Sequence, residues 1–76
     1  MNTITIRDDF IKLGQALKLA GMEESGVEAK YDIEDGKVSV NGEVETRRGR
    51  KLRDGDVFSF DGQECRVSAP NGPRES

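Results

Sequence analysis

The stretch Gly36-Lys37-Val38-Ser39-Val40-Asn41-Gly42 marks the point where the sequence changes from a helical period to a strand period. Polar and apolar residues alternate over residues 37–40, which predicts a strand with one buried face. Asn-Gly is the strongest short turn signal in the chain, because both residue types tolerate the positive φ angles of a tight hairpin turn. The sequence therefore predicts that a hairpin begins here.

A first helix is predicted ahead of this hairpin, after a short strand at residues 3–6. From Phe10 to Gly21, apolar side chains recur three or four positions apart, which is the spacing of an amphipathic helix. Asp8 or Asp9 is the predicted N-cap of this helix, and Gly21 is the predicted C-cap.

A second helix is predicted to begin at Ser25 and to end at residues 35–36. Ser25 and Glu28 have the Ser-x-x-Glu spacing of a capping box, in which the serine oxygen accepts a hydrogen bond from the helix backbone. Tyr31 lies four residues after Val27, so we expect it to pack against the domain rather than to stack on a ligand.

Two longer strands are predicted at residues 57–60 and 64–67, each after an Asp-Gly turn, with a brief strand at residues 43–44. The element order β-α-α-β-β-β predicts an α+β fold, with two helices packed on a small twisted, mainly antiparallel sheet. Residues 69–76 contain two prolines and a glycine, and we expect them to form a disordered tail after a single domain at residues 1–68.

The composition excludes several classes of protein. A chain of 76 residues has room for one small domain and little wall for a large active-site cleft. It has no histidine and one cysteine, Cys65, which excludes Ser-His-Asp chemistry, a CxxC zinc pair and an internal disulfide. We therefore expect a protein that is not an enzyme and needs no metal or cofactor, with Cys65 as a small buried hydrophobic residue.

The sequence also gives no sign of a membrane or export segment. No stretch approaches the ~20 apolar residues that a membrane-spanning helix needs. The first residues lack the basic and apolar segments of a signal peptide, and one cysteine is too few for a small disulfide-stabilised secreted protein. We expect a cytoplasmic protein.

Basic residues are concentrated in one segment. The chain has 12 basic and 15 acidic residues, for a net charge of −3, yet residues 47–53 (Arg-Arg-Gly-Arg-Lys-Leu-Arg) carry five basic residues and no acidic one. The remaining 7 basic and 15 acidic residues leave the rest of the chain at −8. A cationic patch on an anionic body favours phosphate groups while it discourages indiscriminate binding to polyanions.

Four short stretches taken together resemble the αL RNA-binding motif, the S4-like domain type first associated with a ribosomal protein. The family's first helix opens Arg-Leu-Asp-x-x-Leu, its second begins Ser-Arg-x-x-Ala, and the Gly-x-Val-x-Val-Asn-Gly and Leu-x-x-Gly-Asp-x-Val elements follow. The corresponding positions in this chain are residues 12–17, 25–29, 36–42 and 52–58. The match covers about residues 10–60, and the chain is most similar to the small stand-alone bacterial members.

The chain departs from the family pattern in its helical half. Lys12 and Gly14 stand where the family has Arg and Asp, and Gly26 stands in place of the Arg that follows the serine of the second helix. Those family positions help to contact the RNA backbone. The resemblance thus implies that the loop at residues 47–53 carries more of the binding here than is usual.

The resemblance implies a protein that binds structured RNA, either ribosomal or transfer RNA, with ribosomal or RNA-processing proteins as further candidate partners. Arg and Lys suit this role, because guanidinium groups match phosphate oxygens and ammonium groups act as point charges. The predicted RNA-binding residues are the cations of the loop and three lysines of the helices: Lys12, Lys18, Lys30, Arg47, Arg48, Arg50, Lys51 and Arg53.

Two alternative interpretations remain open from the sequence. Val-Asn-Gly followed by Leu-x-x-Gly-Asp also occurs in β-grasp sulfur carriers, although residues 71–76 lack their C-terminal Gly-Gly and the helices here precede the hairpin. The other alternative is a protein-interaction adaptor whose basic loop meets an acidic partner.

Overall fold

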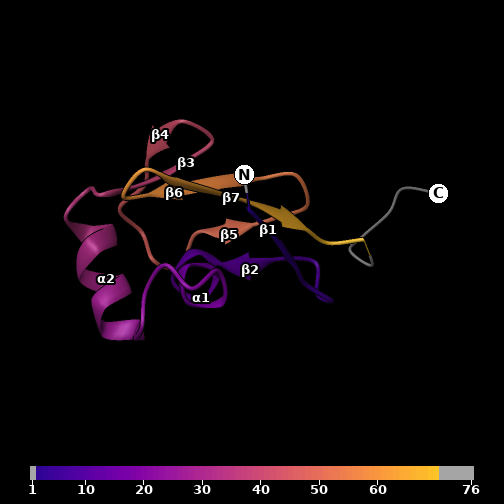
Figure 1. Ribbon diagram of the computed structural model, residues 1–76, viewed down its shortest axis with the longest axis horizontal. Coiled ribbons are helices and arrows are strands. Elements are labelled where there is room, and N and C mark those ends of the chain that lie inside the picture. The colour runs from indigo at the N-terminus through magenta and orange to yellow at the C-terminus, as the bar shows by residue number, and fades with distance from the viewer. Residues whose placement is uncertain (1, 71–76) are drawn as a thin grey trace.

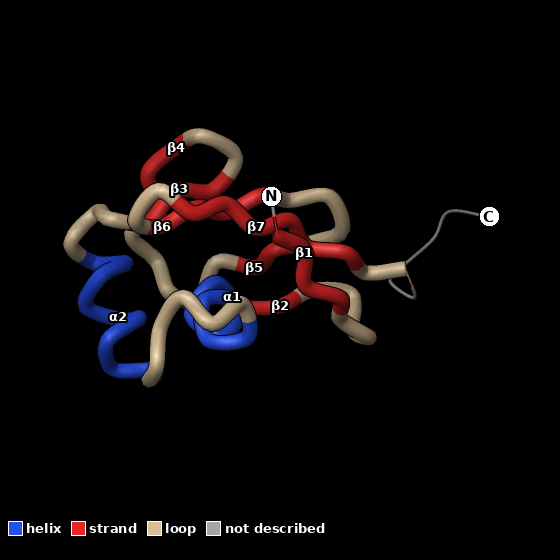
Figure 2. The backbone as a smooth tube through the Cα atoms, viewed as in Figure 1, coloured by secondary structure: helices blue, strands red, loops and turns tan. Residues whose placement is uncertain are grey.

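The computed structural model describes residues 2–70 and has two layers, a mixed sheet and a layer with two helices (Figures 1 and 2). The sheet has the strand order β1-β7-β6-β3-β4. Its strands are Asn2–Thr5 (β1), Val38–Val40 (β3), Glu43–Val44 (β4), Val57–Phe60 (β6) and Gln63–Ser68 (β7). β1 pairs with β7 in parallel, and the other pairings in this sheet are antiparallel. The predicted α+β fold is confirmed.

The second layer contains α1 (Leu13–Leu19), α2 (Gly26–Glu34) and a two-stranded antiparallel sheet of β2 (Ile11–Lys12) and β5 (Lys51–Leu52). The core lies between the two layers. Its largest fully buried side chains come from both helices and from alternate strand positions: Phe58, Leu13, Leu17, Ile33, Leu52, Val38, Val67 and Cys65. Cys65 is a buried core residue, as predicted, and this burial raises the pKa of its thiol.

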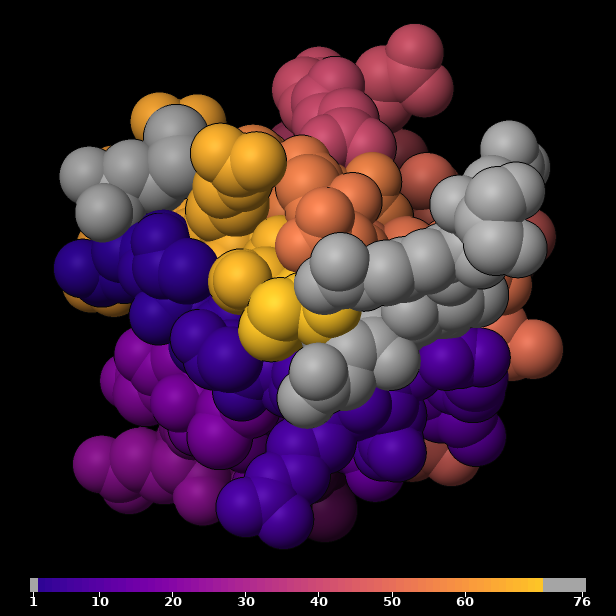
Figure 3. All heavy atoms as spheres, turned by 90° about the vertical axis from the view of Figure 1, so that its right-hand side faces the viewer, coloured from indigo at the N-terminus to yellow at the C-terminus, as the bar shows by residue number. Residues whose placement is uncertain are grey.

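The first and last strands, β1 and β7, are neighbours in the sheet, and Figure 3 shows the indigo and yellow ends of the described chain side by side. The backbone continues this contact beyond β1, where the amide of Ile6 donates to the carbonyl of Ser68 (2.8 Å). Ala69, which the sequence assigns to the tail, is buried, and its amide donates to the Asp54 carboxylate (2.8 Å). The rest of the predicted tail, residues 71–76, lies outside the described residues.

α2 begins where the sequence predicts. Ser25 is the N-cap, and its hydroxyl oxygen accepts a hydrogen bond from the amide of Glu28 (3.2 Å). The predicted packing of Tyr31 is wrong, because α2 turns Ala29 and Ile33 toward the core and leaves Tyr31 59% exposed. Tyr31 belongs to one apolar pair with i,i+4 spacing in this helix, and Ala29 and Ile33 form another. The smaller, aliphatic pair is the one that packs into the core.

α1 begins three residues later than predicted from Phe10, and neither Asp8 nor Asp9 caps it. Its N-cap is Lys12, which has no side-chain capping bond. The first amides of the helix instead donate to carbonyls of the distant loop, Leu13 to Arg50 (2.9 Å) and Gly14 to Arg48 (3.1 Å). Because loop carbonyls satisfy these amides, residues 11–12 are free to pair as a strand, and the loop is fixed against the start of α1.

Candidate nucleic-acid interface

The loop at residues 46–50 and the first turn of α1 surround a shallow depression. Lys12, Gln15 and Lys18 line it from β2 and α1, and Arg48 lines it from the loop, with Gly14, Gly26 and Gly49 between them. A methyl group at Gly14 would lie 3.7 Å from the Cβ atom of Arg48, an ordinary contact distance. A longer side chain at position 14 would therefore contact Arg48.

A second depression adjoins the first on the other side of the loop. It is lined by Arg47, Gly49, Arg50, Lys51 and Arg53, so Gly49 belongs to both. Lys12 and Lys51 also join the two, because they are direct cross-strand partners in the β2–β5 pair. We call this continuous area, with Lys12, Lys18, Arg48, Lys51 and Arg53, the cationic surface.

The alternation of β2 and β5 explains why these cations share one face. Leu52 is fully buried and its partner Ile11 is half-buried, so the neighbouring pair Lys12 and Lys51 points to solvent. Like charges directly opposite each other destabilise a sheet. An anion bound between these two lysines would relieve their mutual repulsion.

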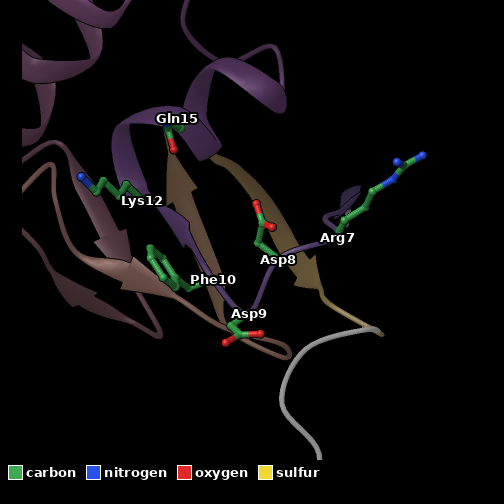
Figure 4. A pocket seen from close by; sticks show the side chains of 6 residues that line it. All are labelled: Arg7, Asp8, Asp9, Phe10, Lys12 and Gln15. Atoms are coloured by element: carbon green, nitrogen blue, oxygen red, sulfur yellow. The ribbon is translucent and has the colours of Figure 1, made fainter.

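Phe10 lies at the edge of the cationic surface, although the sequence assigns it to a helix. The Lys51 ammonium is 4.7 Å from the centre of its ring and the Arg53 guanidinium carbon is 5.8 Å away, both within range of cation–π attraction. Figure 4 shows Phe10 and Lys12 in a further depression, with Asp8, Asp9 and Gln15 around it and the Arg7 side chain directed outward. The ring thus helps to orient two of the loop cations.

Glu45, which the sequence does not single out, is buried beside the loop and binds two of its arginines. The Arg47 guanidinium donates to both carboxylate oxygens (3.1 and 3.2 Å), and the Arg50 guanidinium donates to one (2.7 Å). These bonds lower the pKa of Glu45 to about 2. An acid two and five residues before a pair of arginines is the only sequence signal for this cluster.

The structure therefore divides the predicted RNA-binding residues into three groups. Within residues 2–70, ion pairs at 4 Å or less involve Lys37, Arg47 and Arg50 as the only cations. In the same range, the side-chain charges of the five residues of the cationic surface form no ion pair. Lys30 is half-buried on α2 and lines neither of the two adjoining depressions.

Residues 2–70 bring together no group of three or more Asp, Glu, Cys or His side chains that could hold a metal ion. Neither α1 nor α2 has the length and apolar character that a membrane-spanning helix requires.

A two-layer α+β domain of this topology, with a basic loop fixed against the start of its first helix, is an αL-motif domain. The chain belongs to the S4 domain family, whose model matches residues 4–68. The resemblance inferred from the motifs is confirmed, and the fold is not that of the β-grasp alternative.

Relatives of the chain span most of its length. It is 48% identical over 61 residues to the Bacillus subtilis "Probable ribosome maturation protein RlbA", and the matched region covers 80% of this chain and 86% of that protein. It is 44% identical over 59 residues to the Escherichia coli "Putative RNA-binding protein YbcJ", and the matched region covers 78% of this chain and 84% of that protein. The solution structure of E. coli YbcJ, described as revealing an αL motif involved in RNA-binding, matches with a TM-score of 0.71 at 40% identity, over 91% of this chain and 89% of that one.

Proposed function

We propose that this protein is a non-enzymatic RNA-binding protein that holds the phosphate backbone of structured RNA on the cationic surface. The observation that carries the proposal is the gathering of five cations around the start of α1 whose side chains form no ion pair within residues 2–70, in a chain whose net charge is −3. Unpaired like charges repel one another, and RNA phosphates relieve that repulsion.

The proposed mode of binding is recognition of shape through the backbone. The cationic surface presents ammonium and guanidinium groups, which bind phosphates of any sequence, and its depressions are shallow. A-form RNA offers a regular array of phosphates and 2′-hydroxyls to such a surface. Local geometry of the RNA, rather than base edges, then selects the site.

Ribosomal RNA is the first candidate ligand, because the B. subtilis relative is named as a ribosome maturation protein. Transfer RNA is the second candidate, by analogy with the wider family. We place the protein in the cytoplasm, with ribosomal or RNA-processing proteins as candidate partners on the same RNA.

The proposal is tested by measuring the binding of rRNA fragments and bulk tRNA from low to physiological salt. The test variant combines Arg48→Ala and Lys51→Ala, and the matched control combines Lys37→Ala and Arg66→Ala, which also removes one Lys and one Arg. Arg66 is exposed on β7 between the buried Cys65 and Val67, so it points away from the core and the helix layer. We expect the test variant to bind about tenfold more weakly and the control to bind within about twofold of the unchanged protein.

Circular dichroism establishes that both variants remain folded. Absence of binding by the unchanged protein at low salt contradicts the proposal. Equal losses in the two variants contradict the placement of the site, because the control residues lie outside the cationic surface. Full competition by polyglutamate at equal charge concentration would instead favour the adaptor interpretation.

A further inference from the structure

We infer that Glu45 is a positioning residue of the interface, whose carboxylate shapes the basic loop so that Arg48, Lys51 and Arg53 face the RNA. This inference rests on the proposed RNA binding. It assigns to an acidic side chain a role that promotes the binding of a polyanion.

The Glu45 carboxylate binds both the backbone and the side chains of residues that follow it in the sequence. Its side chain is only 8% exposed and accepts from five donors. Two of them are the backbone amides of Thr46 (3.0 Å) and Arg47 (3.1 Å), and the others belong to the Arg47 and Arg50 guanidinium groups. A carboxylate that binds the amides of residues 46 and 47 and the side chains of residues 47 and 50 fixes the path of the chain between them.

The path of the chain through the basic loop also sets the arrangement of the cationic surface. The amide of Arg50 donates to the carbonyl of Arg47 (3.2 Å), which closes the loop into a turn. The carbonyls of Arg48 and Arg50 then accept the hydrogen bonds from Gly14 and Leu13 at the start of α1. The loop conformation that Glu45 stabilises is thus the one that places Arg48 opposite Lys12 and Lys18.

The ion pairs with Glu45 also separate the basic residues that follow it into two groups. The Arg47 and Arg50 guanidinium groups hydrogen-bond to Glu45, whereas the side-chain charges of Arg48, Lys51 and Arg53 form no ion pair within residues 2–70. The five cations of residues 47–53 therefore form two groups. Two of them order the loop, and three are available to bind phosphates. The pKa of Glu45, about 2, keeps the carboxylate ionised at any pH where RNA binding is measured.

Electrostatics and positioning predict opposite results when Glu45 loses its charge. If Glu45 acted only through its charge, Glu45→Gln would strengthen RNA binding, because one negative charge near the phosphates would be removed. If Glu45 positions the loop, the same variant weakens binding, because the amide cannot accept from all five donors. The sign of the change separates the two.

Glu43 provides a matched control. It is exposed in β4, two residues before Glu45, and no ion pair within residues 2–70 involves it. Glu43→Gln therefore removes the same charge in the same neighbourhood without touching the loop. We expect Glu43→Gln to bind RNA as tightly as the unchanged protein or up to about twofold tighter, and Glu45→Gln to bind about tenfold more weakly.

Amide hydrogen exchange provides a readout that is independent of RNA. We expect the amides of Thr46 and Arg47 to lose protection in Glu45→Gln and to keep it in Glu43→Gln, since only the first variant changes their acceptor. Glu45→Asp keeps the charge but shortens the side chain, so it serves if Glu45→Gln fails to fold. We expect Glu45→Asp to bind several-fold more weakly, because the shorter side chain cannot reach both arginines.

Binding by folded Glu45→Gln or Glu45→Asp at the level of Glu43→Gln would overturn the inference and leave the proposed function intact. Absence of RNA binding by the unchanged protein would instead overturn the proposed function, and the positioning role with it. Because every variant is compared with the unchanged protein on the same RNA, the two failures are distinguishable.

Discussion

Asn41 joins two turns that lie far apart in the sequence. Its φ of 51° falls in the left-handed region that asparagine tolerates. Its side-chain amide donates to the Asp56 carboxylate (3.1 Å), and its side-chain oxygen accepts from the amide of Val57 (3.0 Å). Asp56 also accepts from the amide of Arg53 (2.8 Å), so this contact orders the backbone of a cationic-surface residue. The Val-Asn-Gly and Gly-Asp motifs are thus two halves of one hydrogen-bonded unit.

The Asn41–Asp56 contact leads to a prediction about stability. Asn41→Asp replaces the donor with a second carboxylate and should lower the free energy of unfolding by about 1–2 kcal/mol at pH 7. Adding Asp56→Asn should restore most of this loss, because the new amide can donate to position 41 while its oxygen still accepts from Arg53. Urea unfolding of the single and double variants provides the measurement. A double variant less stable than Asn41→Asp alone would contradict the assigned contact.

Glu23 introduces a pH dependence into the fold. It is buried after α1, and this burial, together with the nearby Asp32 carboxylate, raises its pKa from 4.5 to about 7. The folded state therefore retains a proton that the unfolded chain releases, so the stability contributed by Glu23 is complete below pH 4.5. It falls as the pH rises from 4.5 to about 7.

We predict that Glu23→Gln removes this part of the pH dependence. The variant should be more stable than the unchanged protein at pH 8, where the unchanged protein must hold an ionised Glu23 in a buried position. Chemical unfolding at intervals from pH 4.5 to pH 8 tests this, with Glu24→Gln, an exposed neighbour, as the control. An equal gain in both variants would point to general charge repulsion rather than to burial.

At the scale of elements, the β2–β5 pair carries two cations that destabilise the fold and that we propose bind RNA. Lys12 and Lys51 face each other across it, and Lys12→Glu would turn a repulsive pair into an attractive one. We predict that Lys12→Glu raises the free energy of unfolding by about 0.2–1 kcal/mol while it weakens RNA binding about tenfold or more. Lys18→Glu in the last turn of α1 is the comparison, since it should weaken binding without stabilising the fold. Thermal or urea unfolding with parallel RNA titrations measures both effects.

The two helices show which parts of the fold could be predicted from the sequence. α2 is predicted well, because Ser25 and Glu28 lie in one local capping box whose physics needs no other part of the chain. The start of α1 is predicted wrongly, because the spacing of Phe10, Leu13 and Leu17 fits a helix as it stands. Only the distant loop, which supplies carbonyls to the first helical amides, turns residues 11–12 into a strand.

The candidate site could likewise be predicted only in part from the sequence. Residues 47–53 are recognisable as a basic loop because the charges are consecutive in the sequence. Whether each arginine is paired depends on the burial of Glu45, which the fold decides by placing its backbone amide against the carbonyl of Val38 (3.0 Å). The sequence indicates where cations gather, and the packing determines which of them remain available.

At the scale of the whole molecule, the distribution of charge sets the character of binding. The net charge of −3 repels a polyanion at long range, so attraction must come from the cationic surface at short range. Such binding depends on the number of phosphates neutralised, and each contact releases counterions from the RNA. Salt dependence therefore counts the cations in use.

We predict that the logarithm of the RNA association constant falls with the logarithm of salt concentration at a slope of about −3.5 to −4.5, from 0.7–0.9 per contact and five contacts. The Arg48→Ala and Lys51→Ala double variant should reduce the magnitude of this slope by about 1.5, and the Lys37→Ala and Arg66→Ala control should leave it unchanged. A slope of about −5 to −6 for the unchanged protein would show that Arg47 and Arg50 also neutralise phosphates, and that RNA draws them away from Glu45. A slope near −3.5 to −4.5 means that the ion pairs with Glu45 persist in the complex.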